Sequence, residues 1–489
     1  MTQEQVDGAD KTVQSAQGSP WPALWSMMIG FFMILVDSTI VAVAIPAIAE
    51  SLHATYNDVI WVNSAYLLAY AVPLLITGRL GDRFGPRRMY LLGLVVFTAS
   101  SLACGLAGSV GVLIAARAFQ GLGGAMLTPQ TMSLMIRTFS PTQRGSAMGV
   151  WGAVAGVATI VGPLLGGVFV DLGGWEWIFI VNVPFGIIGL ILAWKYVPRL
   201  ELNARHFDWL GVALSALGMF CLIFGIQEGS NFNWDGRAIG LIAVGVFFIA
   251  IFIVWQSRTT RDALVPLSLF ADRNFALASA AITTVGFAVS TFAIPWMIYV
   301  QRVQEFSPTR AALLILPSGL VSGALSGFVG RRTNTHDPKP YAIAGLAVTS
   351  ISIFASAFIT NPQHSPYWML LISIFYGVGN SLIWGPLSMI ATRNLDPALA
   401  GAGSSVYNTV RQVGAVIGSA TVAAAMSAQL NSRLGGGEAS RSETGPLPDF
   451  LHEPFAAAMS HALLLPAGVL VLGVIMATMF ARTRTWSDG

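Results

Sequence analysis

The sequence predicts an all-α polytopic membrane protein, and three observations lead to that fold class. Of its 489 residues, 54% are hydrophobic and only 10% are charged, whereas soluble proteins carry about 25% charged residues. The mean hydropathy is +0.67. Many apolar segments reach the roughly 20 residues that a helix needs to cross a bilayer. The sequence shows no series of ten-residue segments with alternating polarity, so a transmembrane β-barrel is not expected.

Fourteen apolar segments follow one another along the chain, and we expect each to cross the membrane as a helix. Most connections between them are short. The exception is an outer loop, 427–455, which is rich in Gly, Ser, Pro and charged residues. The predicted spans run over residues 22–48, 57–78, 88–107, 111–136, 144–170, 177–197, 209–228, 237–256, 274–300, 309–329, 341–361, 367–391, 400–427 and 456–481.

The basic residues predict the orientation. Of the 26 Lys and Arg residues, 19 fall in segments that are cytoplasmic when the N-terminus is inside. Because cytoplasmic loops carry an excess of Lys and Arg, we expect both termini to be cytoplasmic. The polar start, Met1–Pro20, lacks the basic beginning of a signal peptide, so the first apolar segment should remain as a helix. We expect the protein to lie in the cell inner (plasma) membrane and to cross it many times.

A weak internal repeat predicts two halves. The sequence GRLGDRFGPRR (Gly78–Arg88) follows the second span, and GRRTNTHDPKP (Gly330–Pro340) follows the tenth. These spans hold the same place in two sets of six, which indicates two parallel six-helix bundles with two inserted helices. The expected division is a cytoplasmic tail (1–21), an N-terminal bundle (22–198), two accessory helices with cytoplasmic linkers (199–273), a C-terminal bundle (274–482) and a second tail (483–489).

Asp37 is the one carboxylate near the middle of a predicted span, within LVDSTIVAVAIP (Leu35–Pro46). An ionised acid in hydrocarbon is costly, so such a residue usually faces a cavity, a partner or a proton path. Arg117 lies about two turns inside the fourth span and needs an acceptor or water. At ~1.5 Å per residue, the two residues lie about 16 Å and 9 Å from the outer side, so they could couple directly or through water. Outward snorkelling of Arg117 is the alternative.

The segment after the second span contains the pattern G-x-L-x-D-R-x-G with a basic tail. A carboxylate there can pair with Arg and accept N–H bonds from a neighbouring helix end, and so clamp two helices in one state. A solvated basic loop that only fixes topology is the alternative. The predicted gating residues are Gly78, Arg79, Asp82, Arg83 and Gly85.

The fifth span contains GVATIVGPLLGG (Gly156–Gly167). Glycines on one face let a second helix approach closely, and a proline removes a hydrogen bond and bends the helix. We expect this segment to form a seam between the halves. Its residues are Gly156, Gly162, Pro163, Gly166 and Gly167.

Other polar and aromatic residues within the spans are candidates for a substrate cavity, although each alone is more often packing. Arg411 could contact substrate or could satisfy helix-end carbonyls where the halves meet. The candidates are Asn63, Tyr66, Gln120, Gln130, Trp296, Asn380, Trp384, Asn408 and Arg411.

Together these motifs resemble the fourteen-helix drug/proton antiporter branch of the major facilitator superfamily. LVDSTIVAVAIP is similar to that branch's first-helix motif, GRLGDRFGPRR to the loop 2–3 motif, RAFQGLGGA to the fourth-span arginine motif, and GPLLGG to the antiporter motif. The resemblance implies two six-helix bundles around a central cavity. It also implies that Asp37 binds a proton or cation, that Arg117 couples to it, and that Asp82 belongs to the gate. Ala42, Glu176 and Asn334 depart from the usual Asn, Arg and Asp.

The expected function is proton-coupled efflux of amphipathic or cationic compounds by alternating access, with substrate and proton competing at Asp37. We expect a monomer surrounded by membrane lipids. One alternative is a lipid or glycolipid exporter or flippase on the same fold. Another is a non-transporting membrane sensor or scaffold.

The sequence argues against several other classes. No Ser/His/Asp, metal-ligand or phosphate-loop pattern is found, so we expect a secondary active transporter rather than an enzyme, with no cofactor and no metal. The net charge of +3 is small and scattered, so no nucleic-acid partner is expected. Cys104 and Cys221 lie in separate apolar spans, which argues against a disulfide or a zinc site.

Overall fold

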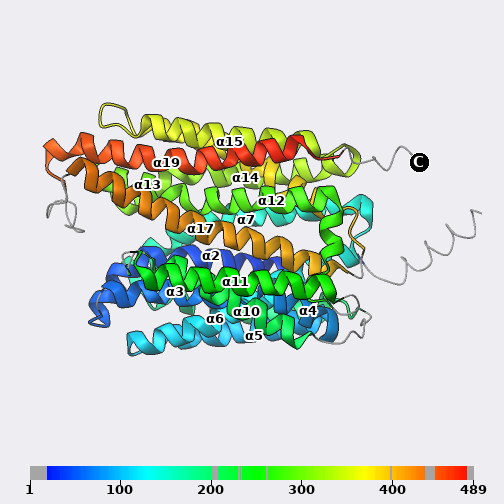
Figure 1. Ribbon diagram of the computed structural model, residues 1–489. Helices are drawn as coiled ribbons and strands as arrows, with labels where there is room; N and C mark the ends of the chain where they lie inside the picture. The colour runs from blue at the N-terminus through cyan, green and yellow to red at the C-terminus, as the bar shows by residue number, and fades with distance from the viewer. Residues whose placement is uncertain are drawn as a thin grey trace, which may run out of the picture.

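The structure is a computed structural model that describes residues 19–54, 56–200, 208–229, 232, 234–259, 263–396, 399–434 and 447–481, and these residues form only helices and connections. The helices lie roughly along one direction (Figure 1). The first are α2 (Trp21–Ser51), α3 (Tyr56–Ala71), α4 (Leu74–Phe84), α5 (Pro86–Gly105), α6 (Val110–Thr138), α7 (Pro141–Gly173), α8 (Trp177–Ile180) and α9 (Asn182–Tyr196). Next come α10 (Trp209–Gln227), α11 (Gly236–Arg258) and η1 (Leu267–Ala271). The last are α12 (Arg273–Thr291), α13 (Ala293–Arg302), α14 (Pro308–Thr335), α15 (Lys339–Ile359), α16 (Trp368–Thr392), α17 (Ala400–Leu434) and α19 (Asp449–Thr478).

Thirteen helical stretches of the described chain are long and apolar enough to cross a membrane, and α3 with α4 make a fourteenth that is bent by 46°. The bend lies at Pro73, which has no N–H to continue the helical hydrogen bonds. The fourteen-span helical fold is therefore confirmed. The orientation of the termini stays a prediction.

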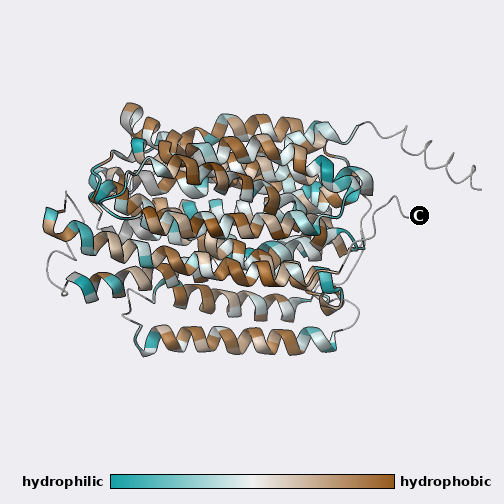
Figure 2. Ribbon diagram, turned by 90° about the horizontal axis from the view of Figure 1, so that it is seen from above, coloured by the Kyte–Doolittle hydropathy of each residue, from teal (hydrophilic) through white to brown (hydrophobic). Residues whose placement is uncertain are grey.

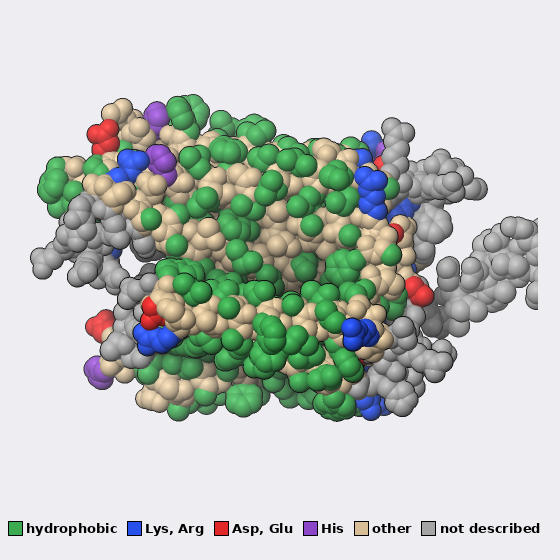
Figure 3. All heavy atoms as spheres, in the orientation of Figure 1, with side chains coloured by type: hydrophobic (Ala, Val, Ile, Leu, Met, Phe, Trp, Pro, Cys, Tyr) green, Lys and Arg blue, Asp and Glu red, His purple; other side chains and the backbone are tan. Residues whose placement is uncertain are grey.

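The surface has the polarity of a membrane protein. Figure 2 shows hydrophobic residues along the middle of the helices and hydrophilic residues toward their ends. In Figure 3, charged side chains gather at the two ends of the molecule, with a broad hydrophobic band between them. Large apolar side chains of the described residues are exposed, among them Phe119 at 63%. Such a surface is favourable in the hydrocarbon core of a bilayer.

Two groups of helices lie side by side, one above the other in Figure 1. In the first group, α3 and α5 pack against α6, and α2 packs against α9. In the second group, α12 packs against α17, and α15 packs against both α16 and α19. The groups join where α7 meets α14 and α16, and where α17 meets α4 and α6. The accessory helix α10 packs on α11 and also touches both α3 and α17. It therefore covers part of the line along which the two groups meet.

Several helix ends differ from the sequence expectation. The segment expected as a loop after the second span is mostly helical, because α4 continues to Phe84 and only Gly85 separates it from α5. Thr77, Gly78 and Gly81 are buried, and their packing stabilises the helical turns of α4 that continue past the apolar segment. In the same way, α14 continues to Thr335.

The outer loop 427–455 is also shorter than expected, since α17 extends to Leu434 and α19 begins at Asp449. Residues 435–446 of that loop lie outside the described residues, as do residues 1–18 of the first predicted tail, the whole second tail and part of the linkers around α10 and α11.

Candidate functional site

Asp37 lies within the 31-residue helix α2 and is completely buried. Its Oδ2 accepts a hydrogen bond from Nη1 of Arg117 at 2.5 Å. Its Oδ1 accepts from Nε2 of Gln120 at 2.8 Å and from Nδ2 of Asn182 at 3.1 Å. Three helices, α2, α6 and α9, therefore supply one carboxylate and its three donors.

Arg117 is also completely buried. Its Nε donates to the carbonyl of Val62 at 3.2 Å, and Nη1 also donates to Oε1 of Gln120 at 2.7 Å. The guanidinium carbon lies 4.0 Å from the centre of the Tyr66 ring and 5.6 Å from that of Phe179. Its Nη2 is buried and has no hydrogen-bond partner among the described atoms. One N–H donor group of the site, Nη2 of Arg117, is therefore unpaired among the described atoms.

Ser101 of α5 fixes the two amides. Its Oγ accepts from Nε2 of Gln120 at 2.9 Å and from Nδ2 of Asn182 at 3.0 Å. It donates in turn to the carbonyl of Phe179 at 3.1 Å. The network around Asp37 therefore spans four helices and the short helix α8. We call these residues, Asp37, Ser101, Arg117, Gln120 and Asn182, the Asp37 network.

The surroundings of Asp37 act on its charge in two opposite ways. Burial favours the neutral form of the acid, whereas Arg117 and the two amide donors stabilise the carboxylate. A proton on Asp37 would leave the guanidinium of Arg117 buried without a counter-ion, which is strongly unfavourable. A protonated Asp37 would therefore favour another position or environment of Arg117.

The enclosure of Asp37 changes one expectation. In this conformation, side chains of the first helix group surround the carboxylate on all sides and occupy its acceptor positions. A substrate between the halves cannot touch it. Direct competition between proton and substrate would first require these contacts to open.

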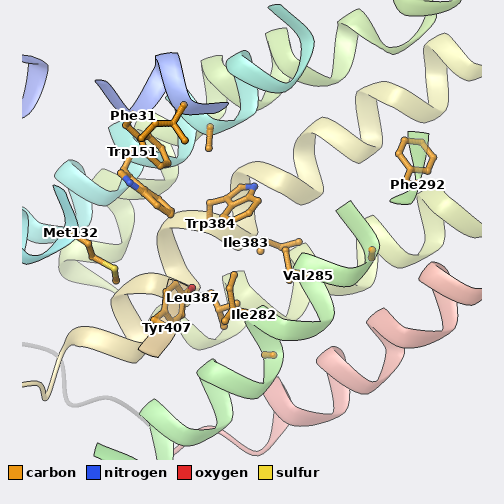
Figure 4. Close-up of a cluster of buried hydrophobic side chains, with 14 of the residues drawn as sticks. Phe31, Met132, Trp151, Ile282, Val285, Phe292, Ile383, Trp384, Leu387 and Tyr407 are labelled. Carbon is orange, nitrogen blue, oxygen red and sulfur yellow. The ribbon is translucent and has the colours of Figure 1, made fainter. Parts of the chain in front are cut away.

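An aromatic cluster lies where the halves meet (Figure 4). Trp151 of α7 stacks on Phe31 of α2, with ring centres 4.8 Å apart, and meets Trp384 of α16 edge-on at 6.0 Å. The indole Nε1 of Trp384 donates to Oδ1 of Asn380 at 3.1 Å. We call Phe31, Trp151 and Trp384 the central aromatic cluster.

Polar residues of α17 lie near this cluster. Asn408 is completely buried, with Nδ2 bonded to the Ser404 carbonyl at 2.9 Å and 3.9 Å from the sulfur of Met132. Its Oδ1 has no hydrogen-bond partner within the described chain, and neither does the buried Nε of Arg411. Figure 4 shows Met132 and Tyr407 in the same region. Two buried polar atoms of α17, Oδ1 of Asn408 and Nε of Arg411, are therefore left without a hydrogen bond among the described residues.

Some of the cavity candidates lie elsewhere. Gln130 is buried between α6 and α4, where its Nε2 donates to the Thr77 carbonyl at 2.8 Å, so it joins two helices. Trp296 is buried with its ring 5.7 Å from that of Tyr299. The Oδ1 of Asn63 is buried on α3. Tyr66 and Gln120 belong with Arg117 and Asp37 instead of a cavity wall.

Two of the predicted gating residues, Gly78 and Asp82, lie against α17. The carboxylate of Asp82 lies against the first turn of α17, because a Cβ added at Gly401 would be 2.6 Å from its carboxylate carbon. Gly78 packs against Ser405 in the same way. Gly85 has φ +97°, a conformation that favours glycine, and it allows α4 to pass directly into α5.

Arg79 joins the predicted gating residues to the segment that follows the helix α11. Its Nε donates to the Leu264 carbonyl at 2.8 Å, its Nη2 donates to the Ala263 carbonyl, and its Nη1 lies 3.7 Å from Asp82. Both carbonyls belong to the segment after α11. Arg83 is exposed and lies 5.3 Å from the ring of Phe84. The equivalent contact of the second half is uncharged, since Asn334 donates to Ser146 at 2.8 Å.

The predicted seam on α7 has two faces. Gly156 faces Ser322 of α14, and a Cβ added at Gly167 would lie 3.7 Å from Oγ1 of Thr309, both across the halves. Gly162 faces α2 in its own half, because a Cβ there would lie 3.0 Å from the Val36 carbonyl oxygen. Pro163 lies inside α7, and Gly166 is buried beside it.

Sequence reasoning missed several of these residues. Ser101, Asn182 and Trp151 were not among the candidates, although each is a polar or large aromatic residue inside an apolar span. A close approach of the backbones of α7 and α14 was also missed. A Cβ added at Gly330 of α14 would lie 2.8 Å from the Cα of Gly149 of α7.

Comparison with known proteins agrees with this architecture. The family model described as Major Facilitator Superfamily matches residues 27–208 and 209–419. The chain belongs to the major facilitator superfamily. It is therefore a multi-pass membrane transporter rather than an enzyme.

Its relatives lie in the drug-efflux branch of the superfamily. An uncharacterized MFS-type transporter of Mycobacterium tuberculosis is 48% identical over 94% of this chain and 80% of its own length. The tetracenomycin C resistance and export protein of Streptomyces glaucescens is 31% identical over 98% of this chain and 95% of its own length. The multidrug resistance protein Stp of Mycobacterium tuberculosis is 32% identical over 83% of this chain and 76% of its own length.

Two solved structures share the fold at low sequence identity. The human organic anion transporter TETRAN has a TM-score of 0.65 and 14% identity, covering 94% of this chain and all of its own. The proton:xylose symporter XylE has a TM-score of 0.65 and 11% identity, covering 95% and 97%. They show the major facilitator fold of this transporter.

Proposed function

We propose that this transporter exports amphipathic or cationic compounds from the cell across the inner (plasma) membrane, in exchange for protons. The observation that carries the proposal is the buried ion pair of Asp37 and Arg117, held by the amides of Gln120 and Asn182. An ion pair at this depth is costly and is typical of proton relays in pumps and transporters. The relatives named for tetracenomycin C export and for multidrug resistance support export of such cargo.

The packing suggests how a proton at Asp37 acts on the halves. Proton uptake from outside neutralises Asp37 and frees Arg117, which favours a shift of α2 against α6. The Val36 carbonyl, one residue before Asp37, lies against Gly162 of α7, and Phe31 of α2 stacks on Trp151 of α7. Because α7 also packs along α14, a shift of α2 reaches the join between the halves. Proton and substrate would then exclude each other through conformation.

The central aromatic cluster is the proposed substrate contact. Indole and phenyl faces attract cations and stack on aromatic compounds. Asn408 and the three rings are buried in this conformation, so the halves must part before the cargo reaches them. The unpartnered Oδ1 of Asn408 can then accept an N–H from the cargo. Trp384, already bonded to Asn380, presents a fixed ring to it. This combination suits an amphipathic cation.

The test is transport by the full-length protein in proteoliposomes under an imposed pH gradient. We expect a fluorescent lipophilic cation to be concentrated by the wild type and by Asp235→Asn, a variant of the solvent-accessible cap of α11. Asp37→Asn should still equilibrate the cation but should not concentrate it. Concentrative transport by Asp37→Asn at the wild-type rate would overturn the proton-carrier role.

The same assay separates the alternatives. Transport of a labelled phospholipid or glycolipid with no transport of the cation would indicate a lipid exporter. No transport of any compound, together with unaltered cellular function of Asp37→Asn and Arg117→Gln, would indicate a sensor or scaffold.

A further inference from the structure

A second site lies apart from the Asp37 network, at the end of the molecule where α4 passes into α5 and where α9 ends. A cleft there encloses about 410 Å³. Its size falls within the roughly 300–1,000 Å³ of small-molecule sites. Its walls include Phe84, Arg87, Arg88, Leu91, Trp194 and Arg199.

The cleft is basic. Arg87 is held in place because its Nη2 donates to the carbonyl of Trp194. Arg199 lies near enough to Arg87 to act on it electrostatically. Among the described residues, no acidic side chain lines the cleft and no carboxylate forms an ion pair with Arg87, Arg88 or Arg199. Three gathered guanidinium groups favour an anion, and their planar donors fit phosphate oxygens.

One wall of the cleft is apolar and faces outward. Trp194 is 67% exposed and Phe84 47% exposed. The next residues of α9, Lys195 and Tyr196, are also exposed. Exposed Trp and Tyr beside basic residues mark the level of the membrane interface. A free phosphate would use only the guanidinium groups, whereas a phospholipid would also cover the apolar wall.

We propose that this cleft binds the phosphate headgroup of an anionic phospholipid. Arg87, Arg88 and Arg199 contact the phosphate, and the rings of Trp194 and Phe84 pack against the glycerol and the upper acyl chains. The cleft lies at the end that the basic residues predict to be cytoplasmic, where anionic lipids attract basic segments. The site does not depend on what the transporter exports.

The test is native mass spectrometry of the full-length protein with added phosphatidylglycerol or phosphatidylcholine. The wild type should prefer phosphatidylglycerol, and the double variant Arg88→Gln/Arg199→Gln should bind it about tenfold more weakly or worse. Both side chains are exposed, so the variant should fold. Arg258→Gln, at the exposed end of α11, is the matched control and should keep the preference. Arg88→Lys/Arg199→Lys should retain most of the binding.

Two results would overturn the proposal. One is a double variant that binds phosphatidylglycerol as well as Arg258→Gln does. The other is equal binding of the two lipids by the wild type. Excess inorganic phosphate or glycerol 3-phosphate identifies the source of the anion: we expect neither to displace the lipid, and displacement by either would show a site for a soluble anion instead.

Discussion

Nη1 of Arg117 donates to Oδ2 of Asp37 at 2.5 Å, and neither side chain has any exposed surface. The two residues come from α2 and α6, 80 positions apart in the chain. Each compensates the charge of the other in a place that water does not reach. Any event that neutralises one must therefore move or rehydrate the other, and this dependence is what we expect a proton-driven transporter to use.

The first prediction concerns the pair itself. Arg117→Gln leaves the carboxylate of Asp37 buried alone, which should destabilise the protein by about 3–5 kcal/mol. The double variant Asp37→Asn/Arg117→Gln removes both charges and should unfold at a higher temperature than Arg117→Gln. Thermal unfolding in detergent measures the unfolding temperatures of the wild type and the variants. Arg411→Gln, a partly exposed arginine within α17, is the control and should lie near the wild type.

The second prediction concerns Asn182. Asn182→Ala removes one donor from the carboxylate of Asp37, so the ionised form loses stabilisation. The pH profile of transport should therefore move to higher pH, because Asp37 is protonated more readily. Asn274→Ala is the matched control: Asn274 and Asn182 are each 4% exposed, and Asn274 bonds to Ala481 at the far side of the other half. An unmoved profile for Asn182→Ala would contradict the assigned role.

The third prediction concerns the contact of α4 with α17. A methyl group at Gly401 would collide with the carboxylate of Asp82, and relieving the overlap costs about 1–3 kcal/mol. Gly401→Ala should therefore open this end of the molecule. Distances between spin labels on the exposed ends of α4 and α17 should lengthen. A Cβ added at Gly327 would have no other atom within 4 Å, so the control Gly327→Ala should leave the distances between the labels unchanged. Equal distance distributions for the two variants would contradict the gate.

The fourth prediction concerns the link between the gate and the accessory helices. Arg79→Ala removes both hydrogen bonds to the carbonyls of Ala263 and Leu264. Hydrogen exchange in residues 263–271 should rise several-fold, because that segment loses its fastening to α4. Arg83→Ala, a change on the exposed side of the same helix, is the control. Unchanged exchange in Arg79→Ala would mean that the hydrophobic contacts of the segment hold it alone.

The fold and the central ion pair could be predicted because both leave strong local signals. A bilayer requires long apolar runs, which composition shows directly. Asp37 and Arg117 are conspicuous because charges are so rare within those runs. Their direct contact in the structure agrees with a depth argument that used only helix rise.

The rest of the site could not be predicted, because its residues are ordinary until they are placed. Asn182 and Ser101 differ from dozens of other small polar residues only in what surrounds them. Gly162 was expected at the seam between halves, but the rotation of α7 turns it toward α2 and turns Gly149 toward α14. The GRLGDRF segment was expected to be a loop, since helical turns stabilised by tertiary packing carry no hydrophobic period of their own.

The most direct test of the account is proton release from the purified, detergent-solubilised transporter when substrate is added, measured with a pH indicator in weakly buffered solution. If proton and substrate exclude each other through Asp37, the wild type and Asp235→Asn should each release protons on binding a lipophilic cation. Asp235 is a suitable control because the hydrogen bond from Arg237 lowers its pKa and keeps it ionised. Asp37→Asn should bind the cation and release none. Equal proton release by Asp37→Asn and the wild type would contradict the account.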